Sequence, residues 1–361
     1  MAAVVFESGK NVDYAHDHMK GVKDLLDAGV TNSVPDKYVF PENRRPSVAQ
    51  VVQGESIPII DISGLDGSQH ERLQTIQSLA QACAEWGFFR VINHGIEASL
   101  VARMLDVAHQ FFSLTSEEKM KYGNRDVSDP LRYGTSFNTN IDQFFSWRDY
   151  LRHFCYPVLQ TPDNPPNYRD VAGQYFKETR KMALKLMAAV SESLGLQPTY
   201  IETVFREGLQ FGVVNFYPEC PQPELTMGFA PHSDHGGLTI LLQNEVGGLQ
   251  VRHKGHWVAV EPVPNTFIVN VGDHLEIVSN GRYKSVEHRA VVNAERTRIS
   301  IAAANGPALD ALIFPAPQLV DETHPPLYRS MLYGEFARYL QTTELRGKDN
   351  LDLLKIPKQE Q

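Results

Sequence analysis

The spacing of apolar residues divides the chain into a helical first part and a strand-rich second part. Apolar side chains recur at helical spacing in segments 71–85, 98–112 and 170–194, so each segment predicts a helix with one apolar stripe. Beyond residue 210, short apolar segments are separated by turn residues, and the predicted strands are 211–217, 238–243, 249–252, 257–260, 266–271, 283–289 and 298–303. Short strands at this regular spacing favour an antiparallel sandwich or barrel.

The remaining segments frame this β-core. Residues 22–30 predict a short amphipathic helix stopped by Gly29. A proline-punctuated strap follows, then strands at 57–62 and 87–93, and a helix at 333–343. The predicted class is therefore α+β, with helices on both sides of the β-core in sequence. Its segments are an N-terminal helix and strap (1–56), a helical region (57–205), the β-core (206–310) and a C-terminal helix and tail (311–361).

Composition and charge exclude several classes of protein. The net charge of −9 and the lack of a basic stripe argue against a nucleic-acid partner. The three cysteines are few, odd in number and scattered, which is not a disulfide framework and fits a reducing compartment. No run of apolar residues is long enough to span a membrane. We expect a cytoplasmic protein, with a nuclear pool compatible with the same pattern, and a monomer.

The candidate chemistry centres on His232-Ser233-Asp234. On a strand, His232 and Asp234 would point to the same face, and a later strand delivers His288. Two imidazoles and one carboxylate form the facial triad that suits Fe(II) and leaves coordination positions open. Arg298 and Ser300 follow on one strand face, where a guanidinium fork and a hydroxyl suit a carboxylate ligand.

These motifs, in this order, resemble the plant 2-oxoglutarate and Fe(II)-dependent dioxygenases. The matching stretches are 215–221 (Asn-Phe-Tyr-Pro-Glu-Cys-Pro), 232–234, 279–285, 288–289 and 298–300, with 57–61 and 86–95 further upstream. The resemblance covers nearly the whole chain. It implies a double-stranded β-helix, a jelly-roll related to the cupins, with iron near one mouth of the barrel. It also implies that the apolar side of helix 22–30 faces the substrate region, and a peripheral packing helix is the alternative.

The resemblance also implies the roles of individual residues. His232, Asp234 and His288 would bind Fe(II), and the cosubstrate 2-oxoglutarate would be held by Arg298, Ser300, Tyr217 and Asn215. With O2 the cosubstrate would be decarboxylated to succinate and CO2 while a small metabolite or hormone is hydroxylated or desaturated. Ascorbate is the expected reductant.

Four other histidines compete as ligands, and we assign none of them to the metal. His253 and His256 lie beside a Lys-Gly turn and are expected to be solvated. His274 and His235 fall outside the family pattern or on the wrong face, although His235 stands where relatives often have proline and could tune access to the iron. His94 closes a strand and is expected to be hydrogen-bonded scaffold.

The substrate is less well specified. The aromatic segment 132–156 could line a pocket for a flat apolar molecule, and resembling enzymes place substrate contacts at Tyr133, Phe137 and Asn138. The other aromatic side chains of that segment, Trp147, Tyr150 and Phe154, are expected to pack in the sheet.

Three positions bear on substrate choice. Enzymes resembling anthocyanidin and flavonol synthases carry a lysine two places before the Asn of the Asn-x-Tyr motif, and an aromatic residue and a glutamate after Arg-x-Ser. This chain has Val213, Ala304 and Gly306 instead, so both activities are disfavoured, and we place Val213 and Ala304 at the substrate. Segments 263–271 and 288–293 look closer to the downy-mildew-resistance type salicylate hydroxylases and the flavanone 3-hydroxylase-like enzymes of specialised metabolism. A salicylate-like phenolic or a flavanone is the expected substrate, with an indole or another hormone as the alternative.

Two readings from other classes stay open. The chain could be a catalytically idle sensor that binds a metal or a hormone-like ligand, or a cupin-like Zn or Mn hydrolase. The complete ligand set together with Arg298 and Ser300 disfavours the sensor. A hydrolase has no need of the arginine and serine pair.

Overall fold

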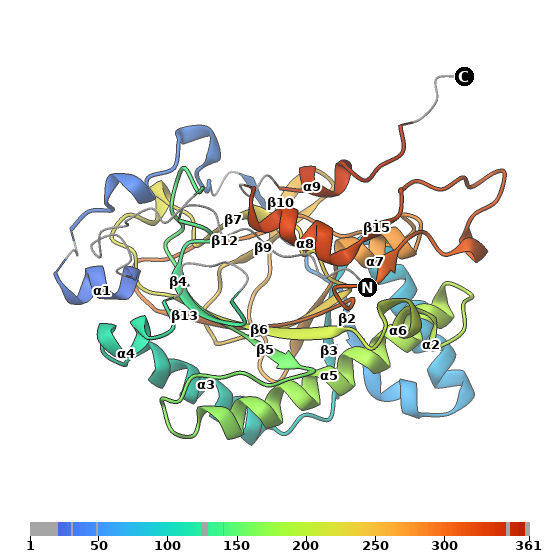
Figure 1. Cartoon of the computed structure of the whole chain (residues 1–361), viewed down its shortest axis with the longest axis horizontal. Coiled ribbons are helices and arrows are strands. Elements are labelled where there is room, and N and C mark those ends of the chain that lie inside the picture. The colour runs from blue at the N-terminus through green and yellow to red at the C-terminus, as the bar shows by residue number, and fades with distance from the viewer. Residues whose placement is uncertain are drawn as a thin grey trace, which may run out of the picture.

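Two facing sheets form the centre of the structure, a computed structural model that describes residues 21–29, 32–47, 50–123, 129–139, 141–343 and 347–357 (Figure 1). The large sheet has the strand order β2(Ile59–Asp61), β3(Phe88–Ile92), β11(Phe267–Val271), β8(Leu238–Gln243), β13(Arg298–Gly306), β6(Leu209–Tyr217), β5(Asp149–Tyr156) and β4(Leu131–Thr135). The smaller sheet has the order β1(Val51–Val52), β10(His256–Ala259), β9(Leu249–His253), β12(His288–Ala290) and β7(Phe229–His232). A separate hairpin joins β14(Leu312–Ile313) to β15(Met331–Leu332). The predicted α+β class with a double-stranded β-helix is confirmed.

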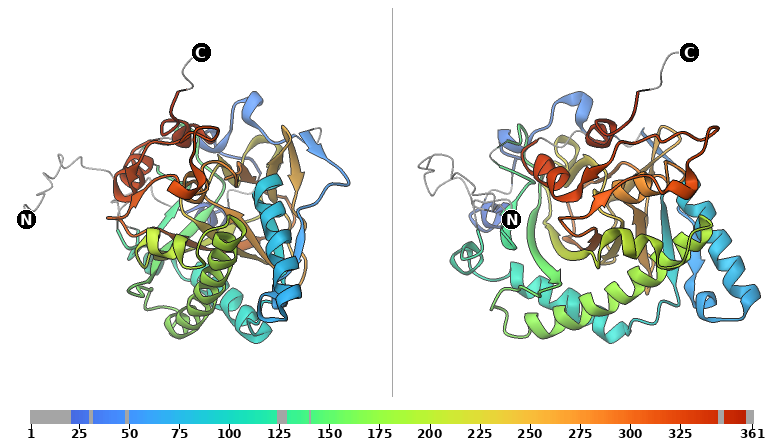
Figure 2. Two further views of the ribbon diagram at one scale, coloured as in Figure 1. Left: turned by 90° about the vertical axis from the view of Figure 1, so that its right-hand side faces the viewer. Right: turned by 45° about the vertical axis from the view of Figure 1, so that its right-hand side comes forward.

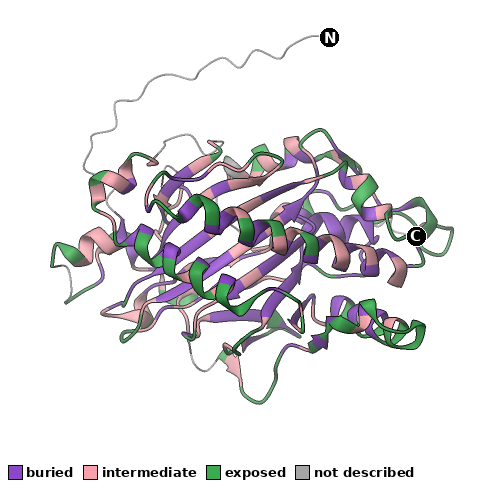
Figure 3. Cartoon of the chain, turned by 90° about the horizontal axis from the view of Figure 1, so that it is seen from below, coloured by how far each residue is buried: buried purple, intermediate pink, exposed green. Residues whose placement is uncertain are grey.

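Three long helices cover the outer face of the large sheet, as the apolar stripes predicted: α2(Gln69–Glu85), α3(Ala98–Phe112) and α5(Tyr168–Ser193). Ser68 starts α2 through a capping box with Glu71, which satisfies amide groups that the first turn leaves unpaired. Figure 3 shows buried strands behind helices whose outward-facing residues are exposed. In the described part of the chain, no helix has both the length and the apolar character needed to cross a bilayer.

Shorter helices complete the fold. The α-helices are α1(Val22–Asp27), α4(Ser116–Met120), α6(Tyr200–Phe205), α7(Asp273–Val278), α8(Tyr333–Gln341) and α9(Asp349–Asp352). The 3-10 turns are η2(Asp36–Tyr38), η3(Glu42–Arg44), η5(Ile62–Asp66), η6(Pro223–Leu225) and η7(Pro317–Leu319). Figure 2 shows the C-terminal elements, drawn in red, on the opposite side of the sheets from α5. The expected helix at 333–343 is confirmed as α8, while the segment boundaries at 57, 206 and 311 stay predictions.

The register of the large sheet decides which side chains share its inner face. Directly opposed residues of antiparallel strands point to the same side, and alternate residues point to the other side. Three inner rows result: Tyr150, Asn215, Ser300 and Gln243; then Arg152, Val213, Ala302 and Leu241; then Phe154, Phe211, Ala304 and Thr239. The residues between these rows, such as Leu151, Val214 and Ile301, are buried in the core on the helix side. The inner face therefore combines polar side chains, such as Asn215 and Ser300, with aromatic and aliphatic ones.

The predicted strand 283–289 is wrong for most of its length. Only His288 and Arg289 belong to β12, and the preceding residues form turns after α7. Asn280 and Gly281 have φ values of 50° and 73°, a left-handed turn that breaks the extended backbone. Tyr283 is nevertheless buried, and its hydroxyl lies 2.6 Å from the Ser193 hydroxyl. The alternation of buried and exposed side chains came from turn packing rather than from a sheet.

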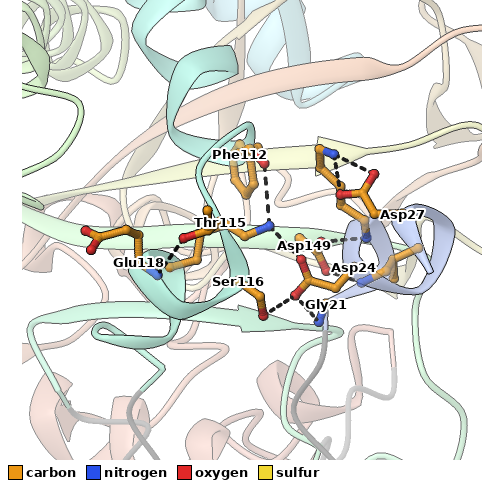
Figure 4. Close-up of polar contacts among 11 residues, drawn as sticks. Gly21, Asp24, Asp27, Phe112, Thr115, Ser116, Glu118 and Asp149 are labelled. Carbon is orange, nitrogen blue, oxygen red and sulfur yellow. Dashed lines mark hydrogen bonds and ion pairs between the residues drawn. The ribbon is translucent and has the colours of Figure 1, made fainter.

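The first described helix is fixed by buried charges (Figure 4). The amides of Val22 and Lys23 donate to the two Asp149 carboxylate oxygens at 2.7 and 3.0 Å. Lys119 binds Asp24 at 2.9 Å, and only 1% of the Lys119 side chain is exposed. Burial raises the pKa of Asp149 to about 6, against the lowering effects of those two amides and of Lys119. Of the predicted helix 22–30, residues 22–27 are helical, while Val30 lies outside the described residues.

We predict that Lys119→Met lowers the free energy of unfolding by about 3 kcal/mol at about pH 7.5, because it leaves buried carboxylates without their cation. This loss of unfolding free energy should be smaller at about pH 5. The folded-state pKa of Asp149 lies above its usual value of 3.8, so protonation favours the folded state as the pH falls through about 6. Urea unfolding at both pH values measures this.

The matched control is Lys121→Met, which removes a lysine whose side chain is 54% exposed and should change stability by no more than about 0.5 kcal/mol. An equal loss at both pH values for Lys119→Met would mean that packing, rather than charge, carries the contact.

Candidate metal centre and cavity

The three predicted ligands lie together at one end of the space between the sheets. His232 ends β7, His288 begins β12, and these two residues are directly opposed in the antiparallel pair. Their ring centroids are 4.2 Å apart. Asp234 Oδ1 lies 3.8 Å from Nε2 of His232 and 3.7 Å from Nε2 of His288. Asp234 stands in the loop after β7, so a turn of the loop, and not the strand pleat, brings it to His232.

Backbone carbonyls orient both imidazoles. Nδ1 of His232 lies 2.9 Å from the Ala230 carbonyl, and Nδ1 of His288 lies 3.2 Å from the Val286 carbonyl. An Nδ1–H that donates to a carbonyl leaves the Nε2 lone pair on the side of Asp234. Burial and the neighbouring His288 lower the pKa of His232, which keeps it in the neutral form that binds metals.

Asp234 is held by residues of the neighbouring strands. Asn270 Nδ2 donates to Asp234 Oδ2 at 2.8 Å, and the Thr239 hydroxyl supplies a second bond. Burial acts to raise the pKa of Asp234, but the two histidines and these hydrogen bonds outweigh it and lower the pKa. Gly272 allows its backbone to lie close to the loop that carries Asp234, because a Cβ at Gly272 would collide with the Gly236 carbonyl. Asn270 was missed at the sequence level, where its only signal was one amide inside an apolar strand.

This donor set fits a transition metal. Each separation from Asp234 is shorter than twice a metal–nitrogen bond of about 2.1 Å, so one ion can contact all three atoms. All the ligand atoms lie within 4.8 Å of one another. Two imidazoles and one carboxylate on one side of an ion, with the other side facing a cavity, match the facial triad of non-haem Fe(II).

The cavity beside this centre has a volume of about 280 Å³. At its inner end Arg298 is fully buried, with Nη1 3.2 Å from Ser300 Oγ and Nη2 3.1 Å from Gln243 Oε1. Its Nε has no partner, and its guanidinium lies 4.9 Å from the Tyr217 ring centroid. Asn215 Nδ2 donates to Ser300 Oγ at 3.4 Å. The four residues predicted to hold the cosubstrate therefore lie together, around a cation that has no carboxylate partner among the described residues.

Four of the five predicted substrate residues line the cavity, and one does not. Phe137, Asn138, Val213 and Ala304 line the cavity. Tyr133 does not: it is 1% exposed, and its hydroxyl packs where a Cβ at Gly21 would stand. The expectation of a substrate contact at Tyr133 is corrected, because its strand position points it away from the inner face.

The packing assignments need a similar correction. Tyr150 and Phe154 line the cavity, since both belong to inner rows of the sheet. Trp147 does pack in the interior as expected, 5.3 Å from the ring of Tyr38. None of the described residues of α1 lines the cavity, so this helix is a peripheral packing element.

The remaining histidines divide into scaffold and lining. His235 lines the cavity with Nδ1 2.8 Å from the Tyr333 hydroxyl, and His274 contacts the same tyrosine from outside it. His256 is exposed, but the prediction that His253 is solvated is wrong, because its ring stacks on Trp86 at 3.6 Å. His94 Nε2 lies 3.3 Å from the Asn265 carbonyl, a scaffold contact.

The end of the described chain closes one side of the cavity. Gly347 forms a parallel β-bridge with His232, and Gly347 and Asn350 contribute to the lining. Lys348 donates to Glu276 Oε2 at 2.5 Å and to the Ser285 carbonyl at 2.6 Å, which anchors this segment to α7 and the turn after it.

We predict that Asn270→Ala weakens metal binding by about 10- to 100-fold, because it removes the donor that orients Asp234. His232→Ala should abolish binding, since two ligands are left. Titration of the metal-free protein with Co(II), followed by absorbance and calorimetry, measures both effects. Replacement of the exposed His256 by alanine is the control and should leave the affinity unchanged; unaltered affinity in His232→Ala would place the metal elsewhere.

Comparison with known proteins agrees with this geometry. Residues 209–307 match the 2OG-Fe(II) oxygenase superfamily, and residues 57–173 match the N-terminal family described as non-haem dioxygenase in morphine synthesis. The chain is 40% identical to rice (Oryza sativa subsp. japonica) flavanone 3-dioxygenase 2, covering 92% of this chain and 97% of that protein. It is 43% identical to Arabidopsis thaliana protein DOWNY MILDEW RESISTANCE 6, covering 87% and 93% respectively.

The solved structures give the same result. A crystal structure of JOX2 in complex with 2OG, Fe and JA superposes with a TM-score of 0.84 at 34% identity, covering 94% of this chain and 98% of that one. The dioxygenase for auxin oxidation from rice superposes with a TM-score of 0.70 at 27% identity, covering 83% and 100% respectively. With relatives this similar over nearly the full length and a His-Asp-His cluster that could hold a metal ion, the chain belongs to the 2-oxoglutarate and Fe(II)-dependent oxygenase superfamily and is a dioxygenase of small metabolites.

Proposed function

We propose that His232, Asp234 and His288 hold the Fe(II), and that Arg298 pairs with the far carboxylate of 2-oxoglutarate. The support for the second assignment is the isolated charge of Arg298. A buried cation without a counter-charge is costly, and a carboxylate ligand repays the cost through bidentate hydrogen bonds. Ser300, Tyr217 and Asn215 surround the same end of the cavity as additional hydrogen-bonding groups.

When bound, Fe(II) with 2-oxoglutarate and O2 supplies the oxidant, and the cosubstrate leaves as succinate and CO2. The residues of the chain position the two organic molecules and exclude water. The aromatic wall and the segment at Gly347 limit solvent access to the space beside His232 and His288.

We propose further that the substrate is a small, flat aromatic molecule such as a salicylate-like phenolic, which is hydroxylated. The observation that carries this proposal is the aromatic lining of the cavity. Phe137, Phe229, Phe154 and Phe211 supply ring faces, while arginine and amide side chains supply polar groups. The volume of about 280 Å³ lies just below the range of roughly 300–1,000 Å³ for ligand pockets, which favours a compact substrate.

A flavanone is the second candidate. Val213 and Ala304 are small residues in the second and third inner rows of the sheet, and they leave room in the part of the cavity away from Arg298. The similarity to rice flavanone 3-dioxygenase 2 supports the same candidate. A flavanone would need the cavity to extend into the open groove that shares Pro130, Phe154, Leu209 and Leu309 with it.

We predict that Arg298→Ala raises the KM for 2-oxoglutarate by about 10- to 100-fold while Co(II) affinity stays unchanged, because a charged hydrogen-bond pair contributes about 1.5–3 kcal/mol. Succinate formation at varied 2-oxoglutarate measures the KM. Arg252→Ala, which removes an exposed arginine, is the control. An unchanged KM in Arg298→Ala would show that the far carboxylate binds elsewhere.

A substrate panel tests the proposed function. Salicylate, a flavanone and an indole such as melatonin are each incubated with enzyme, Fe(II), ascorbate and 2-oxoglutarate, and succinate and oxidised product are measured. We expect the phenolic acid to stimulate succinate formation several-fold and to be hydroxylated. Stimulation by the flavanone alone would favour the second candidate, and stimulation by the indole alone would overturn the proposal of a phenolic substrate.

A further inference from the structure

Arg148 is a second buried cation in the same cavity, and the cosubstrate does not account for it. The residue precedes β5 and is 3% exposed. Its Nη1 donates to Asn215 Oδ1 at 3.1 Å and its Nη2 donates to the Ser136 carbonyl. Its Nε has no hydrogen-bond partner. The guanidinium lies over the ring of Phe229, 3.7 Å from the centroid, and lines the cavity.

No described carboxylate forms an ion pair with Arg148. Asp142 is the acid whose charge acts on it, but that carboxylate is occupied within its own loop. Asp142 Oδ2 accepts from the Ser136 hydroxyl at 2.9 Å, from the Phe137 amide at 3.1 Å and from the Asn138 amide at 2.8 Å. Burying an ion without a partner costs several kcal/mol. Neutral groups and a ring face offset this cost only in part, so the site is set up for an anion.

The charges of the proposed complex point to the substrate as that anion. Fe(II) brings two positive charges and 2-oxoglutarate brings two negative charges. Asp234 adds one negative charge and Arg298 one positive charge, so these four cancel. Both histidine ligands are neutral in a metal complex. Arg148 adds a positive charge beside this balanced set, and an organic anion next to it would offset that charge.

Arg148 adjoins the cosubstrate end on the side of the metal ligands, and Tyr217 interacts with both arginines. Asn215 stands between the two arginines, bonded to Arg148 on one side and to Ser300, the partner of Arg298, on the other. The ring of Phe229, against which the Arg148 guanidinium packs, also has its centroid 4.1 Å from that of the His232 ring. Phe137 stacks with Phe229 at 6.3 Å. A carboxylate bound to Arg148 would therefore lie beside aromatic side chains, and only the Phe229 ring separates Arg148 from the metal ligand His232.

We propose that Arg148 is the specificity-determining residue that anchors the acidic group of an aromatic carboxylate substrate. This inference rests on the proposed function, which assigns an aromatic substrate to the cavity. It names the charge of that substrate and the group that recognises it. Arg152 also lines the cavity, in the next inner row, but its Nη2 is bonded to the Asp129 carbonyl at 2.7 Å, and it is not the anchor.

The test compares a matched acid and its neutral amide, salicylate and salicylamide, as probes of the Co(II)-loaded protein with 2-oxoglutarate bound. Calorimetry gives each Kd without turnover. The wild type should bind salicylate at least about 10-fold more tightly than salicylamide, since a hydrogen-bonded charge pair is worth about 10- to 100-fold. Arg148→Gln should remove that preference by weakening salicylate, while the Kd values of salicylamide, 2-oxoglutarate and Co(II) stay within about threefold. Arg148→Lys, which keeps the charge, should restore part of the preference.

Arg152→Gln is the matched control and should keep the preference for the acid. Equal weakening of both probes in Arg148→Gln would mean that Arg148 only supports Asn215 and the 136–142 loop, and weakening of 2-oxoglutarate would assign it to the cosubstrate. A wild type without preference for the acid would also overturn the proposal. Succinate formation by the wild-type Fe(II) enzyme tests the dioxygenase function separately. If Arg148 does not bind the acidic group, the probe affinities change as described above while succinate is still formed; if the proposed function is wrong, succinate is not formed.

Discussion

The register of one short strand pair determines whether this site exists. β7 and β12 are paired so that His232 stands directly opposite His288, and both rings point toward the large sheet. Because side chains alternate along a strand, a shift of one residue in either strand would turn one imidazole to the other face. The rest of the site is built on that pairing. The loop after β7 carries Asp234, Asn270 holds its carboxylate, and Gly347 pairs with the edge of β7 at His232.

The large sheet adds a second constraint, which is electrostatic. Its inner face places the charges of Arg298 and Arg148 in a closed space, where neither has a carboxylate partner among the described residues. Charges of this kind do not stabilise an empty protein, and they fit anionic ligands. In the proposed complex the two sheets therefore have different roles: the smaller sheet and the loop after β7 supply the metal ligands, and the larger sheet supplies the groups that bind organic anions.

The class of fold could be predicted from the sequence, as could the grouping of His232, Asp234 and His288 and the place of Arg298 and Ser300 in one cavity, because periodicity and short motifs are local properties. Features that depend on the chain returning from far away were less accessible. Tyr133 resembled a substrate residue, but its strand turns it toward Gly21, and His253 looked solvated until Trp86 was placed beside it. Asn270 and Arg148 carried no motif that marked them. Their importance comes from strand register and from burial without a charged partner, which appear only in three dimensions.

The alternation of side chains in the large sheet has a consequence for how such enzymes diverge. Val213 and Arg152 face the cavity, whereas Val214 and Leu151, their neighbours in sequence, belong to the hydrophobic core under the helices. A mutation at a cavity-facing position changes ligand recognition, and a mutation at a core-facing position changes the stability of the fold. Selection can therefore explore new chemical targets by changing every second residue, with the scaffold kept intact throughout.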